Sequence, residues 1–184
     1  MLLGVMLLYV GAVLVVNGVW LIGQTRDEAS ALYIQNREVS VINLFTGFVG
    51  IVAAIVLMTQ GNGGEDLAAV RGGGLILLFA FTYLWVAANN FLNAGGRAFG
   101  WYCLFVAVTA IPAGILTLDT GGGADAAVYL GISWFAWAVL WFVFFLLLAL
   151  DRPVAKLAGA LAIVEGIATA WVFGFLLLWD KISF

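Results

Sequence analysis

Three tryptophans in one apolar segment have the spacing of a single helical face. Trp134, Trp137 and Trp141 stand at i, i+3 and i+7, so a helix places their indoles along one side. Tryptophan in membrane helices usually gathers at the water interfaces, where its N–H group stays hydrated, whereas this series lies in the middle of a long apolar run. The indoles are therefore either bulky packing groups or the wall of a path for a flat, polar molecule.

Two polar side chains lie deep inside other apolar segments. Glu165 is the one acidic residue well within such a segment. An ionisable group there costs at least ~2.5–3.5 kcal/mol and is a functional candidate by default. The alternative is an uncharged carboxyl that is hydrogen-bonded to a neighbouring backbone group, but we favour a functional role. Asn17 is the second candidate, and for an asparagine a role in joining two membrane helices is about equally plausible.

Two further segments each carry residues on one helical face, and each series includes an aromatic or amide group that lipid would not favour. A purely apolar stripe in a membrane helix usually reflects packing or lipid contact, so one stripe alone is weak support for a lumen. The polar members favour a shared lining. The residues are Leu3, Leu7, Val10, Leu14 and Asn17 in the first segment, and Phe79, Tyr83 and Asn90 in the other.

The composition defines the class of protein. Hydrophobic residues make up 65% of the chain and charged residues 9%, and the mean hydropathy is +1.16. A soluble domain has about a quarter charged residues and about half apolar ones, so this chain is an integral membrane protein. The net charge of −3 is carried by loops and forms no basic field, so we expect no nucleic-acid partner.

The residues that catalysis and metal binding need are missing from the sequence. The chain has no histidine and a single cysteine, Cys103, which closes off metal sites with nitrogen or sulfur ligands and a disulfide framework. No glycine-rich phosphate loop is present, no serine–base pair lies at membrane depth, and no lysine lies in the middle of a predicted helix. We therefore expect no cofactor and no enzymatic activity.

Apolar runs of about 20 residues recur along the chain, long enough for a bilayer core of about 30 Å. Charged or glycine-rich stretches separate them, including a predicted loop at 61–71. The first run lacks a basic region before it and exceeds a signal peptide's apolar core, so it is interpreted as a transmembrane helix. We expect one all-α transmembrane domain over 1–184, and a weak repeat at Tyr9, Tyr83 and Tyr129 suggests three helical hairpins. The predicted helices are 2–23, 40–60, 73–93, 98–118, 126–149 and 155–179.

Basic residues are unequally divided between the two sides of this topology. The loops that follow the first, third and fifth helices carry five, and the opposite side carries two. By the positive-inside rule those loops face the cytoplasm, and both termini are extracytoplasmic. The five are Arg26, Arg37, Arg97, Arg152 and Lys156, and the two are Arg71 and Lys181.

Six short motifs run along the chain: LLYVG at 7–11, NG at 17–18, FTYL at 81–84, GWYCLFVA at 100–107, WFAWAVLW at 134–141 and VEGIATAW at 164–171. Together and in this order they resemble the AmiS/UreI family of urea and short-chain amide channels. The resemblance covers nearly the full chain. It implies a six-helix protomer in a homohexamer of the inner membrane, with one solute path per protomer and lipid in the central hole.

The resemblance also implies which residues line the path: Val10, Leu14, Asn17, Phe79, Tyr83, Trp134, Trp137, Leu140, Trp141 and Glu165. Two departures from the family's acid-activated branch stand out. That branch has a longer, histidine-bearing loop between the second and third helices, whereas this chain has no histidine. Leu130 replaces a tryptophan that is expected one turn before Trp134, so the outer mouth is expected to be wider or less aromatic.

The leading hypothesis is a passive channel for urea or short-chain amides without histidine-based acid gating. Moving an amide into hydrocarbon without partners costs ~4–8 kcal/mol, and aromatic rings with N–H or O–H donors offset part of that cost. The apolar side chains of Val10, Leu14 and Leu140 would leave an ion without hydration. Two alternatives stay open: a proton-coupled amide or urea transporter that uses Glu165, and a membrane scaffold whose aromatic residues only pack.

Overall fold

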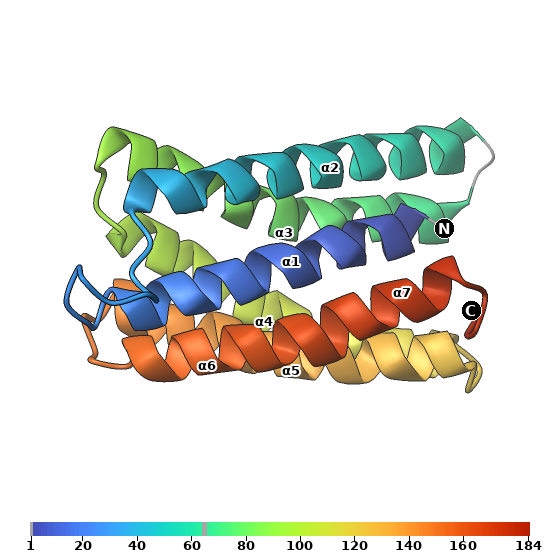
Figure 1. The fold of residues 1–184 in the computed structure, drawn as a ribbon. Helices are drawn as coiled ribbons and strands as arrows, with labels where there is room; N and C mark the ends of the chain where they lie inside the picture. Colours follow the sequence, from blue (N-terminus) through green and yellow to red (C-terminus); the bar gives the residue numbers. More distant parts are fainter. Residues whose placement is uncertain (1, 64–65) are drawn as a thin grey trace.

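The protein is a bundle of six apolar spans. The structure is a computed structural model that describes residues 2–63 and 66–184. Every regular element in these residues is helical, and each span is long and apolar enough to cross a membrane. Both termini lie at the same end of the bundle (Figure 1). The predicted all-α, six-helix membrane fold is confirmed. The spans are α1 (Leu2–Gly23), α2 (Asn36–Gly63), α3 (Leu67–Leu92), α4 (Arg97–Thr120), α5 (Asp125–Leu148) and a sixth composed of α6 (Ala155–Glu165), the π-helix η1 (Gly166–Trp171) and α7 (Val172–Leu178).

The predicted loop at 61–71 was wrong, because helices occupy most of it. The carboxylate of Asp66 accepts hydrogen bonds from the backbone N–H groups of Ala68 (3.0 Å) and Ala69 (3.1 Å), and so caps α3 earlier than expected. A Cβ atom on Gly61 would lie 2.7 Å from the carbonyl oxygen of Asp66. This glycine therefore serves the close approach of α2 and α3 and does not break a helix. Arg71 consequently lies within α3.

Helices α1, α3 and α5 surround the interior of the bundle and supply most of its large buried apolar side chains. The most extensive packing joins α2 with α3, α4 with α5, and α1 with the sixth span. The tyrosine repeat suggested a different grouping, in which the first helix pairs with the second, the third with the fourth and the fifth with the sixth. The stripes predicted on the first, third and fifth helices thus face a common interior.

The contact between α1 and the sixth span depends on facing glycines. A Cβ atom on Gly18 would lie 2.5 Å from the carbonyl oxygen of Gly159, and one on Gly166 would lie 2.8 Å from the Cβ atom of Leu14. Only glycine leaves room for backbones at this separation. The facing pairs are Gly4 with Gly174, Gly11 with Gly166, and Gly18 with Gly159.

The π-helix η1 keeps these glycine pairs in register. On α1 the glycines are seven residues apart, whereas on the sixth span Gly166 and Gly174 are eight apart. In an α-helix with 3.6 residues per turn, the additional residue would rotate Gly174 by about 100°. The N–H of Val172 bonds to the carbonyl of Ile167, five residues back. This wider turn takes up the additional residue, so Gly174 still faces Gly4.

Candidate functional site

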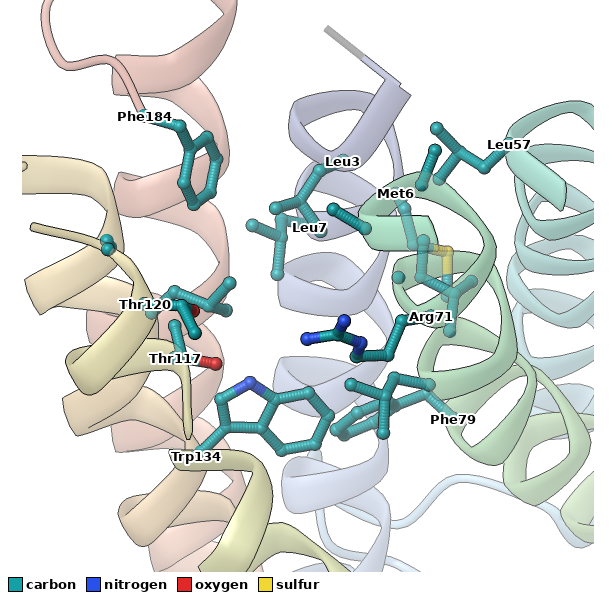
Figure 2. A pocket seen from close by; sticks show the side chains of 18 of the residues that line it. Leu3, Met6, Leu7, Leu57, Arg71, Phe79, Thr117, Thr120, Trp134 and Phe184 are labelled. Carbon is teal, nitrogen blue, oxygen red and sulfur yellow. The ribbon is translucent and has the colours of Figure 1, made fainter. Parts of the chain in front are cut away.

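Two cavities lie between α1, α3 and α5 along the bundle. The larger, of about 520 Å³, lies at the end that carries the termini and is also lined by the ends of α2 and α4 (Figure 2). The smaller, of about 20 Å³, lies further along the same three helices. We call them the large cavity and the small cavity. They share no lining residue, so they are two separate cavities.

Eight of the ten predicted lining residues border one of these cavities, four in each. The large cavity is lined by Val10, Phe79, Trp134 and Trp137, and the small cavity by Leu14, Asn17, Tyr83 and Trp141. Each of α1, α3 and α5 thus supplies residues to the large cavity and residues about one turn further on to the small one. Leu140 and Glu165 are buried but border neither cavity.

Phe79 is the aromatic residue at the boundary between the cavities. Its ring centroid lies 5.4 Å from that of Trp134, 5.0 Å from Trp137 and 5.9 Å from Trp141. Trp134 belongs to the large cavity and Trp141 to the small one. A single ring on α3 therefore contacts the whole tryptophan series of α5, at separations typical of favourable aromatic pairs.

Three hydrogen-bond donors along this line have no protein partner in the part of the chain that the structure describes. They are the indole N–H of Trp134, the indole N–H of Trp141 and the hydroxyl of Tyr83, and all three atoms are buried. A buried donor without a partner costs about 1–3 kcal/mol, and most such groups in proteins are satisfied. A solute with a carbonyl oxygen would provide the missing acceptor.

The central tryptophan is held differently from its neighbours. The indole N–H of Trp137 donates to the hydroxyl of Thr169 at 2.8 Å, and that hydroxyl donates to the backbone carbonyl of Glu165 at 2.6 Å. The hydroxyl of Tyr129 also donates to the carbonyl of Ala168. Both contacts tie α5 to η1. The sequence interpretation missed Thr169, although a threonine inside an apolar run was its signal.

Glu165 is the last residue of α6 and directly precedes the π-helix. The side chain is 7% exposed, and its Oε2 atom has no hydrogen-bond partner among the described residues. It borders neither cavity, and its assignment to the channel lining, like that of the other nine residues, stays a prediction. Within 2–63 and 66–184, no three histidine, cysteine, aspartate or glutamate residues are grouped as metal ligands would be.

Asn17 joins α1 to α2 through a pair of amides. Its Nδ2 donates to Oδ1 of Asn43 at 2.9 Å, and Nδ2 of Asn43 donates back to Oδ1 of Asn17 at 2.6 Å. Asn43 also donates to the carbonyl of Val39 at 2.9 Å. The structure thus shows the helix-joining role that the sequence left open, and Asn17 also borders the small cavity. The sequence interpretation missed Asn43.

Six apolar spans around a line of cavities with unpaired donors define a polytopic membrane protein of the transport class. A sequence profile described as AmiS/UreI family transporter matches residues 2–181. The chain belongs to this family.

Relatives and solved structures cover nearly all of the chain. A putative amidate substrates transporter protein of Mycolicibacterium smegmatis is 39% identical over 95% of this chain and 76% of its own length. An acid-activated urea channel of Helicobacter pylori is 37% identical over 95% and 96% of the two chains. The crystal structure of the Helicobacter pylori urea channel aligns over 100% of both chains with a TM-score of 0.85 and 34% identity. The closed-state cryoEM structure of that channel aligns over 97% and 98% with a TM-score of 0.84 and 34% identity.

Proposed function

We propose that this protein is a passive channel of the plasma membrane for urea and short-chain amides. The observation that carries the proposal is a series of donors at Trp134, Tyr83 and Trp141 that have no partner among the described residues and whose side chains border the two cavities. Urea and amides are flat and neutral, and their carbonyl oxygen accepts hydrogen bonds. The urea channel and the amidate transporter among the relatives support this class of solute.

The physical basis of selectivity is a wall that offsets part of a neutral amide's dehydration. Each free N–H or O–H donor restores one hydrogen bond that the amide loses when it leaves water. The apolar side chains of Val10 and Leu14 offer an ion no polar group in place of its lost hydration shell. Phe79 closes the line between the cavities, so its ring moves when a solute passes. Side-chain rotation of this kind is fast compared with helix rearrangement.

A proton-coupled transporter is the second candidate, because Glu165 places beside the bundle interior a buried carboxyl oxygen that has no partner in the described part of the chain. In that mechanism the carboxyl would gain and lose a proton during each cycle. Accumulation of a labelled amide against its gradient, abolished by an uncoupler, would favour this candidate. Flux that only equilibrates the solute would favour the channel.

We further propose a homohexamer with extracytoplasmic termini, one path in each protomer and lipid in the central hole. The protomer presents large exposed apolar side chains on α2 and α4, such as Phe45, Phe48, Trp101 and Phe105. Such faces suit contact with lipid or with another protomer. The excess of basic residues on the opposite loops supports the orientation.

Stopped-flow measurements on proteoliposomes test the proposed function. Vesicles that contain the protein should take up urea and acetamide faster than empty vesicles, and their leak of sodium chloride should not rise. The double variant Tyr83→Phe, Trp141→Phe removes two free donors while it keeps aromatic rings, so it should lower the urea rate. Equal leak to all three solutes, or no increase over empty vesicles, would overturn the proposal.

The pH dependence of this flux follows from the absence of histidine. Histidine is the side chain whose ordinary titration falls between pH 5 and 8, and the chain has none. We therefore expect urea flux to stay flat between pH 5 and 7.5, apart from any titration of Glu165 itself. The measurement is a series of stopped-flow rates with equal pH on both sides of the vesicle. A steep rise in rate on acidification that persists in Glu165→Gln would contradict it.

A further inference from the structure

Arg71 gives the large cavity a feature that the proposed amide path does not explain. It is the one cationic side chain in the cavity's described lining. Figure 2 shows its guanidinium group projecting from α3 into the hollow, at a height between Leu7 and Trp134 in this view. Most other side chains of the wall are apolar. A guanidinium group keeps its charge at any physiological pH and offers a planar fork of donors.

No aspartate or glutamate side chain is in the wall of this cavity among the described residues. Three aspartates, Asp66, Asp119 and Asp125, are close in sequence to lining residues but do not line it themselves. Asp66 already accepts two backbone hydrogen bonds as the cap of α3. These three carboxylates weaken the attraction of the cavity for an anion, but they do not fill the position at which an anion would bind.

Trp134 adds a second donor to the same cavity. Its side chain is 4% exposed, and its indole N–H has no partner in the described structure. A carboxylate accepts from a guanidinium through two parallel hydrogen bonds and has lone pairs left for a further donor. The apolar side chains of Leu7, Ile76 and Leu130 surround these donors and suit a short aliphatic chain.

We propose that the large cavity binds short-chain aliphatic carboxylates, the charged counterparts of the amides. A carboxylate has the shape of the amide, with an oxygen in place of the NH₂ group. The negative charge of the carboxylate is attracted to the guanidinium group of Arg71. Beyond Phe79 the apolar and aromatic groups offer this charge no positive partner. A bound carboxylate therefore stays in the large cavity and obstructs amide entry. The binding stands on its own, whereas the obstruction rests on the proposed function.

Binding is measured first, on the purified full-length protein in detergent, by equilibrium dialysis of labelled butyrate. We expect saturable binding that Arg71→Gln weakens about two- to fivefold, the range for a charge pair at an exposed guanidinium group, and that Arg71→Lys partly restores. The matched control is Arg97→Gln, which removes a guanidinium at the opposite end of the bundle. Absence of saturable butyrate binding, or equal binding by Arg71→Gln and wild type, would overturn the proposal.

Flux is measured second, as the ratio of acetamide rates with and without butyrate outside the vesicles at pH 7.5 and equal ionic strength. Butyrate should lower this ratio in wild type and in Arg97→Gln, but leave it near one in Arg71→Gln. An amide flux that butyrate does not inhibit would overturn the obstruction while the channel stands. Butyrate binding by a protein that shows no amide flux would overturn the proposed function while the binding site stands.

Discussion

Replacing Gly11 by valine is expected to abolish the folded protomer. A Cβ atom at this position would lie 2.7 Å from the backbone nitrogen of Trp171 and 2.9 Å from its Cα atom. Backbone atoms cannot rotate aside as a flexible side chain can, so α1 would have to move away from the sixth span. That movement would also separate Gly4 from Gly174 and add to the ~1–3 kcal/mol that overpacking usually costs.

Size-exclusion chromatography of the detergent-extracted protein checks this expectation. Gly11→Val should give little protein at the wild-type elution volume, with the remainder aggregated. Gly74→Val is the matched control, because a Cβ atom there would meet nothing within 4 Å although the residue lies inside α3. Wild-type elution and yield of Gly11→Val would show that the close contact between the spans is not required.

Replacing Phe79 by alanine is expected to remove most of the discrimination between short and longer amides. Phe79 contacts all three tryptophans of α5 and stands where the two cavities are separated. Without its ring, the cavities should merge into one wider path. We expect the rate for butyramide relative to acetamide to rise about tenfold, which corresponds to a barrier lower by ~1.4 kcal/mol. Paired stopped-flow rates in proteoliposomes measure this ratio.

Two controls separate selectivity from stability in the Phe79 experiment. Deleting a buried ring costs about 3–5 kcal/mol, so Phe79→Leu provides a variant with a smaller loss of packing and an intermediate expected ratio. Phe105→Ala removes the same ring from a site on α4 that is 59% exposed and should leave the ratio unchanged. A Phe79→Ala protein that elutes normally with the wild-type ratio would contradict the assignment of Phe79 as the barrier.

The sequence predicts the six spans well because each must present about 20 apolar residues to a bilayer. It failed between α2 and α3, where glycines resembled a loop. Gly61 instead allows close packing, because a Cβ atom there would lie 2.7 Å from the carbonyl oxygen of Asp66. Gly73, which was predicted to begin the third helix, serves the same contact, since its Cβ atom would lie 2.8 Å from the carbonyl oxygen of Ala54. A glycine that admits a neighbouring backbone and a glycine that opens a turn have the same local sequence signature. Only the packing partner distinguishes them.

The candidate site shows the same limit. Helical spacing and the family's motifs identified eight residues that border the cavities, because residues on successive turns of one helix share a face. The partners across helices were missed: Asn43 for Asn17 and Thr169 for Trp137. Which polar groups meet depends on the rotation of one helix against another. The tryptophans were interpreted either as packing groups or as the wall of a path, and both interpretations apply. Trp137 is held in place by a hydrogen bond, whereas the indole N–H groups of Trp134 and Trp141 have no partner among the described residues.

The π-helix places a counting constraint on the sixth span that bilayer thickness does not. This span has 24 residues, more than the ~20 needed to cross the membrane, so loss of one residue would leave it long enough. Deletion of one residue between Gly166 and Trp171 would restore the seven-residue spacing of α1, so this turn could become an ordinary α-helix and the two glycines would still face each other. Insertion of one more residue would instead turn Gly174 away from Gly4. Relatives should therefore have either eight residues between these two glycine positions together with a π-helix, or seven together with a regular α-helix. In this segment the number of residues and the type of helix should change together.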